Sequence, residues 1–178
     1  MLTGIKNIIF DFGGVIINID PKKTIQALKQ LKLYNAEKLF TDVNTSNLLN
    51  KYELGIISDN EFLMYVKQYC SQNTTNNEII RAWNAMLLDI PQNRISLLNE
   101  LRKDYKIHLL SNTNHLHYLS YAIDFEKATG GLKFNEFFKK AYFSFELKVR
   151  KPNFEIYKHV LDDQKLKPEE TLFIDDNI

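Results

Sequence analysis

The fold class is decided near the start of the chain, where residues 7–14 read Asn7-Ile8-Ile9-Phe10-Asp11-Phe12-Gly13-Gly14. A short apolar run that stops at a polar residue is typical of a strand buried on both faces of a parallel sheet. The two glycines permit a sharp turn and let the backbone approach a ligand, and the apolar segment Val15–Ile17 follows. The stretch therefore predicts a buried strand that holds the Asp11 carboxylate on a tight loop.

Two further runs have the same form, Ile107–Leu110 before Ser111 and Thr171–Ile174 before Asp175. Residues 140–144 are a less apolar fourth candidate, which we expect nearer an edge. Helical apolar patterns occupy residues 95–101 and 156–161. Alternating strands and helices predict an α/β, doubly wound, Rossmann-like core around a parallel sheet. Ligands of such sheets bind beyond the carboxyl ends of the strands.

The region from about residue 20 to residue 90 lacks a clear buried strand and contains several helical patterns. Ser58 and Glu61 have the spacing of a capping box, in which each side chain bonds the backbone amide of the other residue. We predict a helical cap of residues 19–90, inserted into a core of residues 1–18 and 91–178. The cap, including Trp83, Asn84 and Met86, is expected to select the substrate, although Trp83 also suits a core position.

Composition excludes several classes of protein. The 178 residues are 44% hydrophobic and 25% charged, with a net charge of +1, so no overall field favours nucleic acid or an anionic membrane. One cysteine, Cys70, excludes an internal disulfide and a thiolate metal cluster. No stretch approaches the ~20 apolar residues of a membrane span, and the apolar run after Lys6 is too short for a signal peptide. We predict a cytoplasmic enzyme and leave its oligomeric state open.

Consecutive acids at the end of a buried strand, Asp175 and Asp176, repel each other and lose hydration. A bound cation resolves this conflict, and oxygen ligands indicate Mg²⁺. Asp11, at the end of another strand, supplies a third carboxylate. Taken alone, Asp11 could simply cap a turn or a helix. Asp11-Phe12-Gly13 also matches a kinase metal motif, but the other kinase motifs are absent from the sequence.

Two candidates could hold a phosphate. Ser111 and Asn112 follow a strand, where a hydroxyl and backbone amides can bind a phosphate oxygen or cap a helix. Lys151 precedes Pro152, which favours an extended backbone at Lys151 and could aim the ammonium into a site, although a solvated lysine is the common case. We expect Arg150 on the surface. Lys151 and Mg²⁺ would together offset the three carboxylates and a phosphate monoester.

In this order the motifs resemble the haloacid dehalogenase superfamily: Asp11-Phe12-Gly13-Gly14-Val15, Leu110-Ser111-Asn112, Lys151-Pro152 and Asp175-Asp176-Asn177. The whole chain resembles the bacterial glucose-1-phosphate phosphatase group of that superfamily. Further shared features are Arg150-Lys151-Pro152 and the cap motif Glu53-x-Gly55-x-Ile57-Ser58.

The resemblance implies a Mg²⁺-dependent hydrolase of a small phosphorylated metabolite, with Asp11 as the nucleophile that forms an aspartyl-phosphate. It implies metal ligation by Asp11, the Gly13 carbonyl and Asp176, with Asp175 acting through water. Ser111 and Lys151 would act in catalysis by holding the phosphoryl oxygens. The implied substrate-binding set is Phe12, Gly13, Ser111, Asn112 and Lys151.

Two departures from the family pattern leave alternatives open. Gly13 stands where phosphatases of this superfamily usually carry a second aspartate, a general acid typically worth ~10²–10⁴-fold in rate. The chain also stops at Ile178, directly after the last motif, which suggests either a truncated form or a last strand whose edge is covered in another way. A 2-haloacid dehalogenase and a non-catalytic phosphate-binding protein on the same fold are therefore the competing hypotheses.

Overall fold

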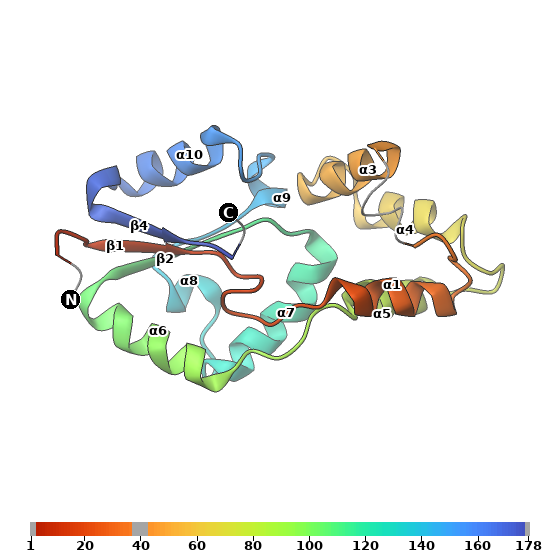
Figure 1. Cartoon of the computed structure of the whole chain (residues 1–178), viewed down its shortest axis with the longest axis horizontal. Coiled ribbons are helices and arrows are strands. Elements are labelled where there is room, and N and C mark those ends of the chain that lie inside the picture. Colours follow the sequence, from red (N-terminus) through yellow and green to blue (C-terminus); the bar gives the residue numbers. More distant parts are fainter. Residues whose placement is uncertain (1–2, 37–42, 177–178) are drawn as a thin grey trace.

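The computed structural model describes residues 3–36 and 43–176, with no account of the side chains of residues 43–47. Asn177, the last residue of the last sequence motif, and Ile178 lie outside the described residues. Four parallel strands form one sheet in the order β3-β2-β1-β4 (Figure 1). Their bounds are β1 Asn7–Phe10, β2 Lys106–Ser111, β3 Ala141–Phe143 and β4 Thr171–Ile174.

The predicted α/β fold is confirmed, including the fourth strand at an edge of the sheet. Helices α6 (Gln92–Asp104), α7 (His115–Ala128) and α8 (Phe134–Phe137) cover one face, and α10 (Phe154–Gln164) covers the other (Figure 1). Alternate side chains of β1 serve the two faces: Ile8 and Phe10 join one core cluster and Ile9 joins the other. The sequence predicted a fully buried strand at residues 171–174, but β4 is only partly buried. The reason is that β4 is an edge strand of this sheet.

The helices after β1 form a cap beside the sheet (Figure 1). They are α1 (Pro21–Gln30), α3 (Val43–Glu53), α4 (Asp59–Lys67) and α5 (Asn76–Asn84). The cap has its own hydrophobic cluster, which contains Leu28, Phe62, Ile79 and Trp83. The predicted capping box of Ser58 and Glu61 is present at the start of α4, and a second one starts α5.

The chain enters and leaves the cap through two paired segments. Ile19 and Leu87 form an antiparallel bridge, and the Asn18 amide donates to the Asp89 carbonyl at 3.0 Å. The domain boundaries at residues 18–19 and 90–91 stay a prediction. Two short elements complete the core, α9 (Ser144–Leu147) and the 3-10 turn Pro168–Glu170. None of the helices in the described residues has the length and apolar character that crossing a membrane requires.

His108 is a buried polar group in β2 whose protonation opposes folding. The side chain is 1% exposed, and neither ring nitrogen has a hydrogen-bond partner among the described residues. Burial, assisted by Lys106 and Lys139, lowers the pKa of His108 to about 4 from an ordinary 6.5. The unfolded chain therefore takes up this proton first, and stability falls as the pH drops from 6.5 toward 4.

Replacing His108 with leucine is expected to raise the free energy of unfolding, because a buried polar ring without partners is removed. The gain should be about 1 kcal/mol at pH 7 and about 2 kcal/mol more at pH 5. Urea denaturation at pH 5, 6 and 7 measures both effects. His159→Leu, at an exposed position of α10, is the matched control. A variant with the same pH dependence as the original protein would contradict the assignment.

Candidate active site

The carboxyl ends of the strands bring the predicted charged residues together. The Lys151 ammonium lies 2.8 Å from Asp11 Oδ1 and 2.6 Å from Asp175 Oδ2. Asp11 follows β1 and Asp175 follows β4, and the Asp11 amide donates to the Ile174 carbonyl at 2.8 Å. Asp11 and Lys151 are both 8% exposed. Lys151 is thus a buried cation between two carboxylates.

Burial controls the ionisation of Asp11. It raises the pKa of the Asp11 carboxyl above its ordinary value, while the charge and hydrogen bond of Lys151 and the Phe12 amide lower it. The nearby Asp175 carboxylate raises this pKa further. Because burial outweighs Lys151, additional positive charge beside Asp11 would favour the ionised, nucleophilic carboxylate.

The loop after Asp11 is tight, as the sequence predicts. The amides of Ile16 and Ile17 both donate to the Phe12 carbonyl, and the Phe12 ring lies in an aromatic core cluster with Tyr121 and Phe134. Phe12 could therefore contribute to substrate binding through its backbone only. Gly14 has a φ of +72°, and a Cβ there would lie 2.1 Å from Asp176 Oδ2. The glycine leaves room for Asp176 over the loop.

The three predicted metal ligands with carboxylates form one group. Asp11, Asp175 and Asp176 each offer an oxygen, and these oxygens lie within 4.8 Å of one another. Such a set of hard oxygen donors suits a divalent cation such as Mg²⁺. One oxygen of Asp175 already contacts Lys151, whereas Asp176 is exposed. This arrangement favours Asp176 over Asp175 as a direct ligand.

Asn112 is held against the backbone of Lys151. Its side-chain oxygen accepts from the Lys151 amide, and its side-chain nitrogen donates to the Lys151 carbonyl, both at 2.9 Å. The peptide bond between Lys151 and Pro152 is cis. The two hydrogen bonds link the end of β2 to the segment that carries the lysine. Asn112 thus positions Lys151, a role that its place beside Ser111 in the sequence does not reveal.

A cavity of about 360 Å³ opens over these groups. Of the predicted site residues, Asp11, Gly13, Asn112, Lys151, Asp175 and Asp176 line it. Ser111 ends β2, is buried, and is not among the lining residues. Four residues that are not among the predicted site residues also line the cavity: Ile19, Arg150, Pro152 and Tyr157.

Arg150 was expected on the surface, but the structure places it between core and cap. Its guanidinium lies 3.2 Å from Glu53 Oε2 and donates to the Asn50 side chain. Burial raises the pKa of Glu53, and the charge of Arg150 opposes this shift. The only signal in the sequence was the position of Arg150 directly before Lys151-Pro152, and the cap partners are about a hundred residues away.

The fold and the acidic site define a hydrolase of the haloacid dehalogenase type, and the chain belongs to that family. The family model described as haloacid dehalogenase-like hydrolase matches residues 5–178. A D-ribitol-5-phosphate phosphatase from Bacteroides thetaiotaomicron is 35% identical over 172 residues, which cover 97% of this chain and 83% of the relative. The superfamily expectation is confirmed, whereas this relative does not specifically support the glucose-1-phosphate phosphatase group.

Solved structures support the same family. A HAD family enzyme from Bacteroides thetaiotaomicron has 36% identity and a TM-score of 0.91, covering 98% of this chain and 86% of that one. Another structure of that enzyme holds magnesium and inorganic phosphate; it has 36% identity, a TM-score of 0.87 and coverage of 97% and 85%. A 2-haloacid dehalogenase from Pseudomonas syringae, at 13% identity and a TM-score of 0.57 with coverage of 95% and 76%, shares the fold alone.

Asn112→Ala is expected to lower kcat by up to about 100-fold. Without Asn112 the Lys151 ammonium can shift, and a shift of about 1 Å in a catalytic group is enough for such a loss. The two lost hydrogen bonds should also reduce the free energy of unfolding by about 1–3 kcal/mol. Steady-state kinetics and denaturation measure the two effects separately. Asn77→Ala, at an exposed position of α5, should match the original protein. A folded Asn112→Ala variant with activity within about twofold would contradict the positioning role.

Proposed function

We propose that this protein hydrolyses the phosphomonoester of a small sugar or sugar alcohol in a Mg²⁺-dependent reaction, with Asp11 as the nucleophile. One observation carries the proposal: the Asp11 carboxylate and the Lys151 ammonium lie 2.8 Å apart in a cavity that also holds Asp175 and Asp176. A nucleophile, a cation for the phosphoryl oxygens and acidic metal ligands are the parts that phosphoryl transfer needs.

In the first step, an Asp11 oxygen attacks phosphorus, the bond between phosphorus and the ester oxygen breaks, and the leaving oxygen takes a proton from water to form the alcohol. In the second step, water attacks the aspartyl-phosphate, which releases inorganic phosphate and restores the carboxylate. Lys151 neutralises charge on the phosphoryl oxygens in both steps. Asn112 holds the lysine backbone in place. Ser111, at the end of β2, is a further proposed contact of the phosphoryl group, although its side chain is buried and does not line the cavity.

Four groups would hold the metal: the carboxylates of Asp11 and Asp176, the Gly13 carbonyl, and Asp175 through water. The close carboxylate oxygens and the space that Gly14 leaves for Asp176 support this set. When bound, Mg²⁺ supplies positive charge that offsets the carboxylates and polarises the phosphoryl group. The magnesium and phosphate complex of the relative supports the same chemistry.

Gly13 bears on the choice of substrate, because it cannot donate a proton to the leaving group. A sugar 1-phosphate has the better leaving group, whereas the named relative acts on D-ribitol 5-phosphate, an ester of a primary alcohol. A substrate panel must therefore contain both kinds. We propose a small metabolite rather than nucleic acid or a membrane as the partner, because net charge is +1 and the cavity is of metabolite size.

The division of labour between domains is part of the proposal. Residues 1–18 and 91–178 form the catalytic core, and residues 19–90 form the cap that borders the substrate's carbon chain. Trp83 supports packing in the cap rather than substrate contact, because it is buried and its ring nitrogen donates to Asn114. Arg150 and Glu53 join the two parts beside the cavity.

Asp11→Asn is expected to lower phosphate release by a factor on the order of 10³ or more, because the neutral amide cannot form the covalent intermediate. Phosphate release with Mg²⁺ from D-ribitol 5-phosphate, glucose 1-phosphate and p-nitrophenyl phosphate measures it. Asp124→Asn, on the exposed surface of α7, is the matched control and should retain activity.

Chelation by EDTA should abolish the activity, and added Mg²⁺ should restore it. Undiminished phosphate release in EDTA would contradict the metal's role. Chloride release from 2-chloropropionate without Mg²⁺ would instead support the dehalogenase hypothesis. Phosphate binding without turnover of any ester would support the non-catalytic one.

A further inference from the structure

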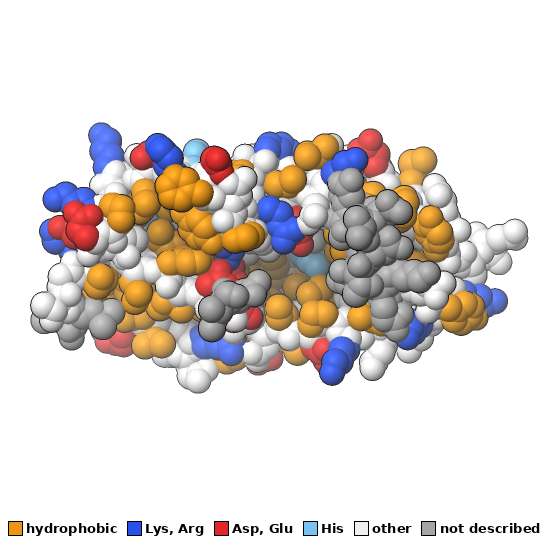
Figure 2. Space-filling model, turned by 45° about the horizontal axis from the view of Figure 1, so that its top comes forward, with side chains coloured by type: hydrophobic (Ala, Val, Ile, Leu, Met, Phe, Trp, Pro, Cys, Tyr) orange, Lys and Arg blue, Asp and Glu red, His pale blue; other side chains and the backbone are white. Residues whose placement is uncertain are grey.

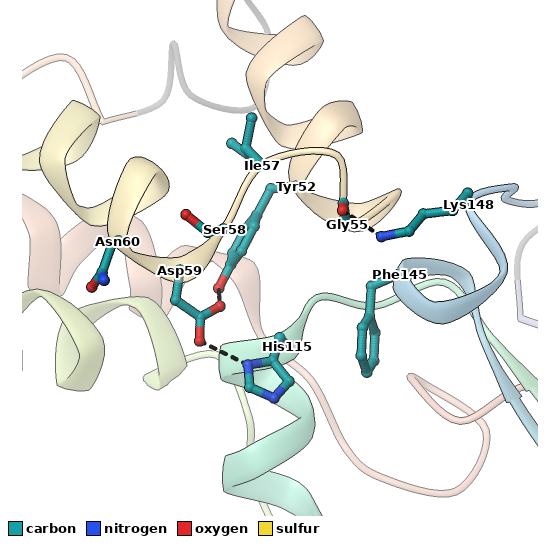
Figure 3. Close-up of a pocket in the computed structure, with 9 residues that line it drawn as sticks. All are labelled: Tyr52, Gly55, Ile57, Ser58, Asp59, Asn60, His115, Phe145 and Lys148. Carbon is teal, nitrogen blue, oxygen red and sulfur yellow. Dashed lines mark hydrogen bonds and ion pairs between the residues drawn. The ribbon is translucent and has the colours of Figure 1, made fainter.

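A second cavity, of about 450 Å³, lies between the cap and the core. The turn between α3 and α4 and the start of α4 line it on the cap side, and His115, Phe145 and Lys148 line it on the core side (Figure 3). Its volume falls in the roughly 300–1,000 Å³ range of small-molecule sites. None of its lining residues belongs to the reaction site described above.

The two cavities share their supporting segments. Asn112 lines the reaction cavity and His115 the second cavity, three residues apart at the end of β2. Lys148 and Arg150 divide in the same way on the segment after α9. Figure 2 shows the surface hollowed between a group of acidic side chains and the cap, with a histidine side chain in the hollow. The two cavities are therefore neighbours along the boundary between core and cap.

A series of hydrogen bonds fixes one imidazole in this cavity. His115 Nδ1 lies 2.7 Å from Asp59 Oδ2, and the Tyr52 hydroxyl donates to Asp59 Oδ1 at 2.7 Å. The Tyr52 oxygen in turn accepts from the Leu116 amide. Burial and the bond to Asp59 raise the pKa of Tyr52, so it remains a donor. Because a carboxylate only accepts, Nδ1 carries the proton that faces Asp59, and in the neutral imidazole Nε2 is the acceptor.

The remaining wall groups suit hydroxyls rather than a second anion. The Asp59 carboxylate beside His115 disfavours another negative charge. Lys148 donates one hydrogen bond to the Gly55 carbonyl and retains two further donors. The Phe145 ring lies edge-to-face with His115, with a centroid distance of 5.7 Å, and offers apolar surface next to both polar groups. Donors, an acceptor and an aromatic surface are the complement of a hydroxylated carbon chain.

We propose that this cavity is the subsite for the hydroxylated carbon chain of the phosphomonoester. His115 Nε2 accepts from a hydroxyl, the Lys148 ammonium donates to one, and Phe145 packs against the carbon-bound hydrogens. Asp59 and Tyr52 are positioning residues that act through His115. This inference rests on the proposed phosphatase function and adds to it the residues that recognise the substrate's uncharged part.

The test compares D-ribitol 5-phosphate with p-nitrophenyl phosphate, which has no hydroxylated chain, in the full-length protein with Mg²⁺. His115→Ala and Lys148→Met should each lower the ratio of the two kcat/KM values by about tenfold, the value of one lost hydrogen bond. The loss should lie mainly in KM for D-ribitol 5-phosphate. Asp59→Asn should shift the ratio in the same direction through the misplaced imidazole. His159→Ala, at an exposed position of α10, is the control and should leave the ratio unchanged.

An unchanged ratio in both His115→Ala and Lys148→Met would overturn the proposal. An equal fall for both esters would also overturn it, because that result indicates a structural role. A wild-type protein that hydrolyses neither ester would contradict the phosphatase function itself. A wild type that is active, with variants of unchanged ratio, would contradict the assignment of this cavity alone.

Discussion

The Lys151 ammonium lies between two carboxylates, 2.8 Å from Asp11 and 2.6 Å from Asp175. Charges buried in this way are tolerated only when each has a partner of opposite sign at close range. This constraint involves the whole core, because Asp11 lies more than a hundred residues before Lys151 and Asp175 in the sequence. Only a parallel sheet whose strands β1 and β4 are in register at Phe10 and Ile174 brings the two acids to the same lysine.

The backbone around this trio is specified by short polar and glycine residues rather than by the core. Asn112 bonds the amide and carbonyl of Lys151, which fixes where the lysine side chain begins. Gly14 occupies a left-handed conformation and leaves room for the Asp176 carboxylate. A side chain at position 14 would displace that acid and disrupt the proposed metal-binding group. The conformation of the loop at Gly14 and the position of the Asp176 carboxylate therefore depend on each other.

The sequence predicts the parts of this molecule in which local pattern and tertiary environment agree. The predicted strands β1 and β2 are largely apolar because both faces are covered. Asp11, predicted after β1, lines the reaction cavity, whereas Ser111 ends β2 and does not. What the sequence could not predict are contacts between distant segments. Most arginines lie on the surface, and nothing in the sequence shows that Arg150 pairs with Glu53 of the cap. The sequence predicts Asn112 as a phosphate ligand or a helix cap. Only the structure shows that the oxygen and nitrogen of its side chain both bond the Lys151 backbone.

The division between core and cap separates two kinds of recognition. Three carboxylates and one ammonium leave the reaction cavity negatively charged, so a phosphate monoester can enter only with a cation that offsets this charge. In the cavity beyond Arg150, the Asp59 carboxylate and the Lys148 ammonium have opposite charges, so the local charge is balanced. In the proposed function, affinity for the phosphoryl group depends on the metal, and discrimination among esters depends on hydrogen bonds to uncharged groups. Discrimination of this kind against an ester that lacks a hydroxyl is strong, because the missing hydroxyl leaves a polar protein group without its partner.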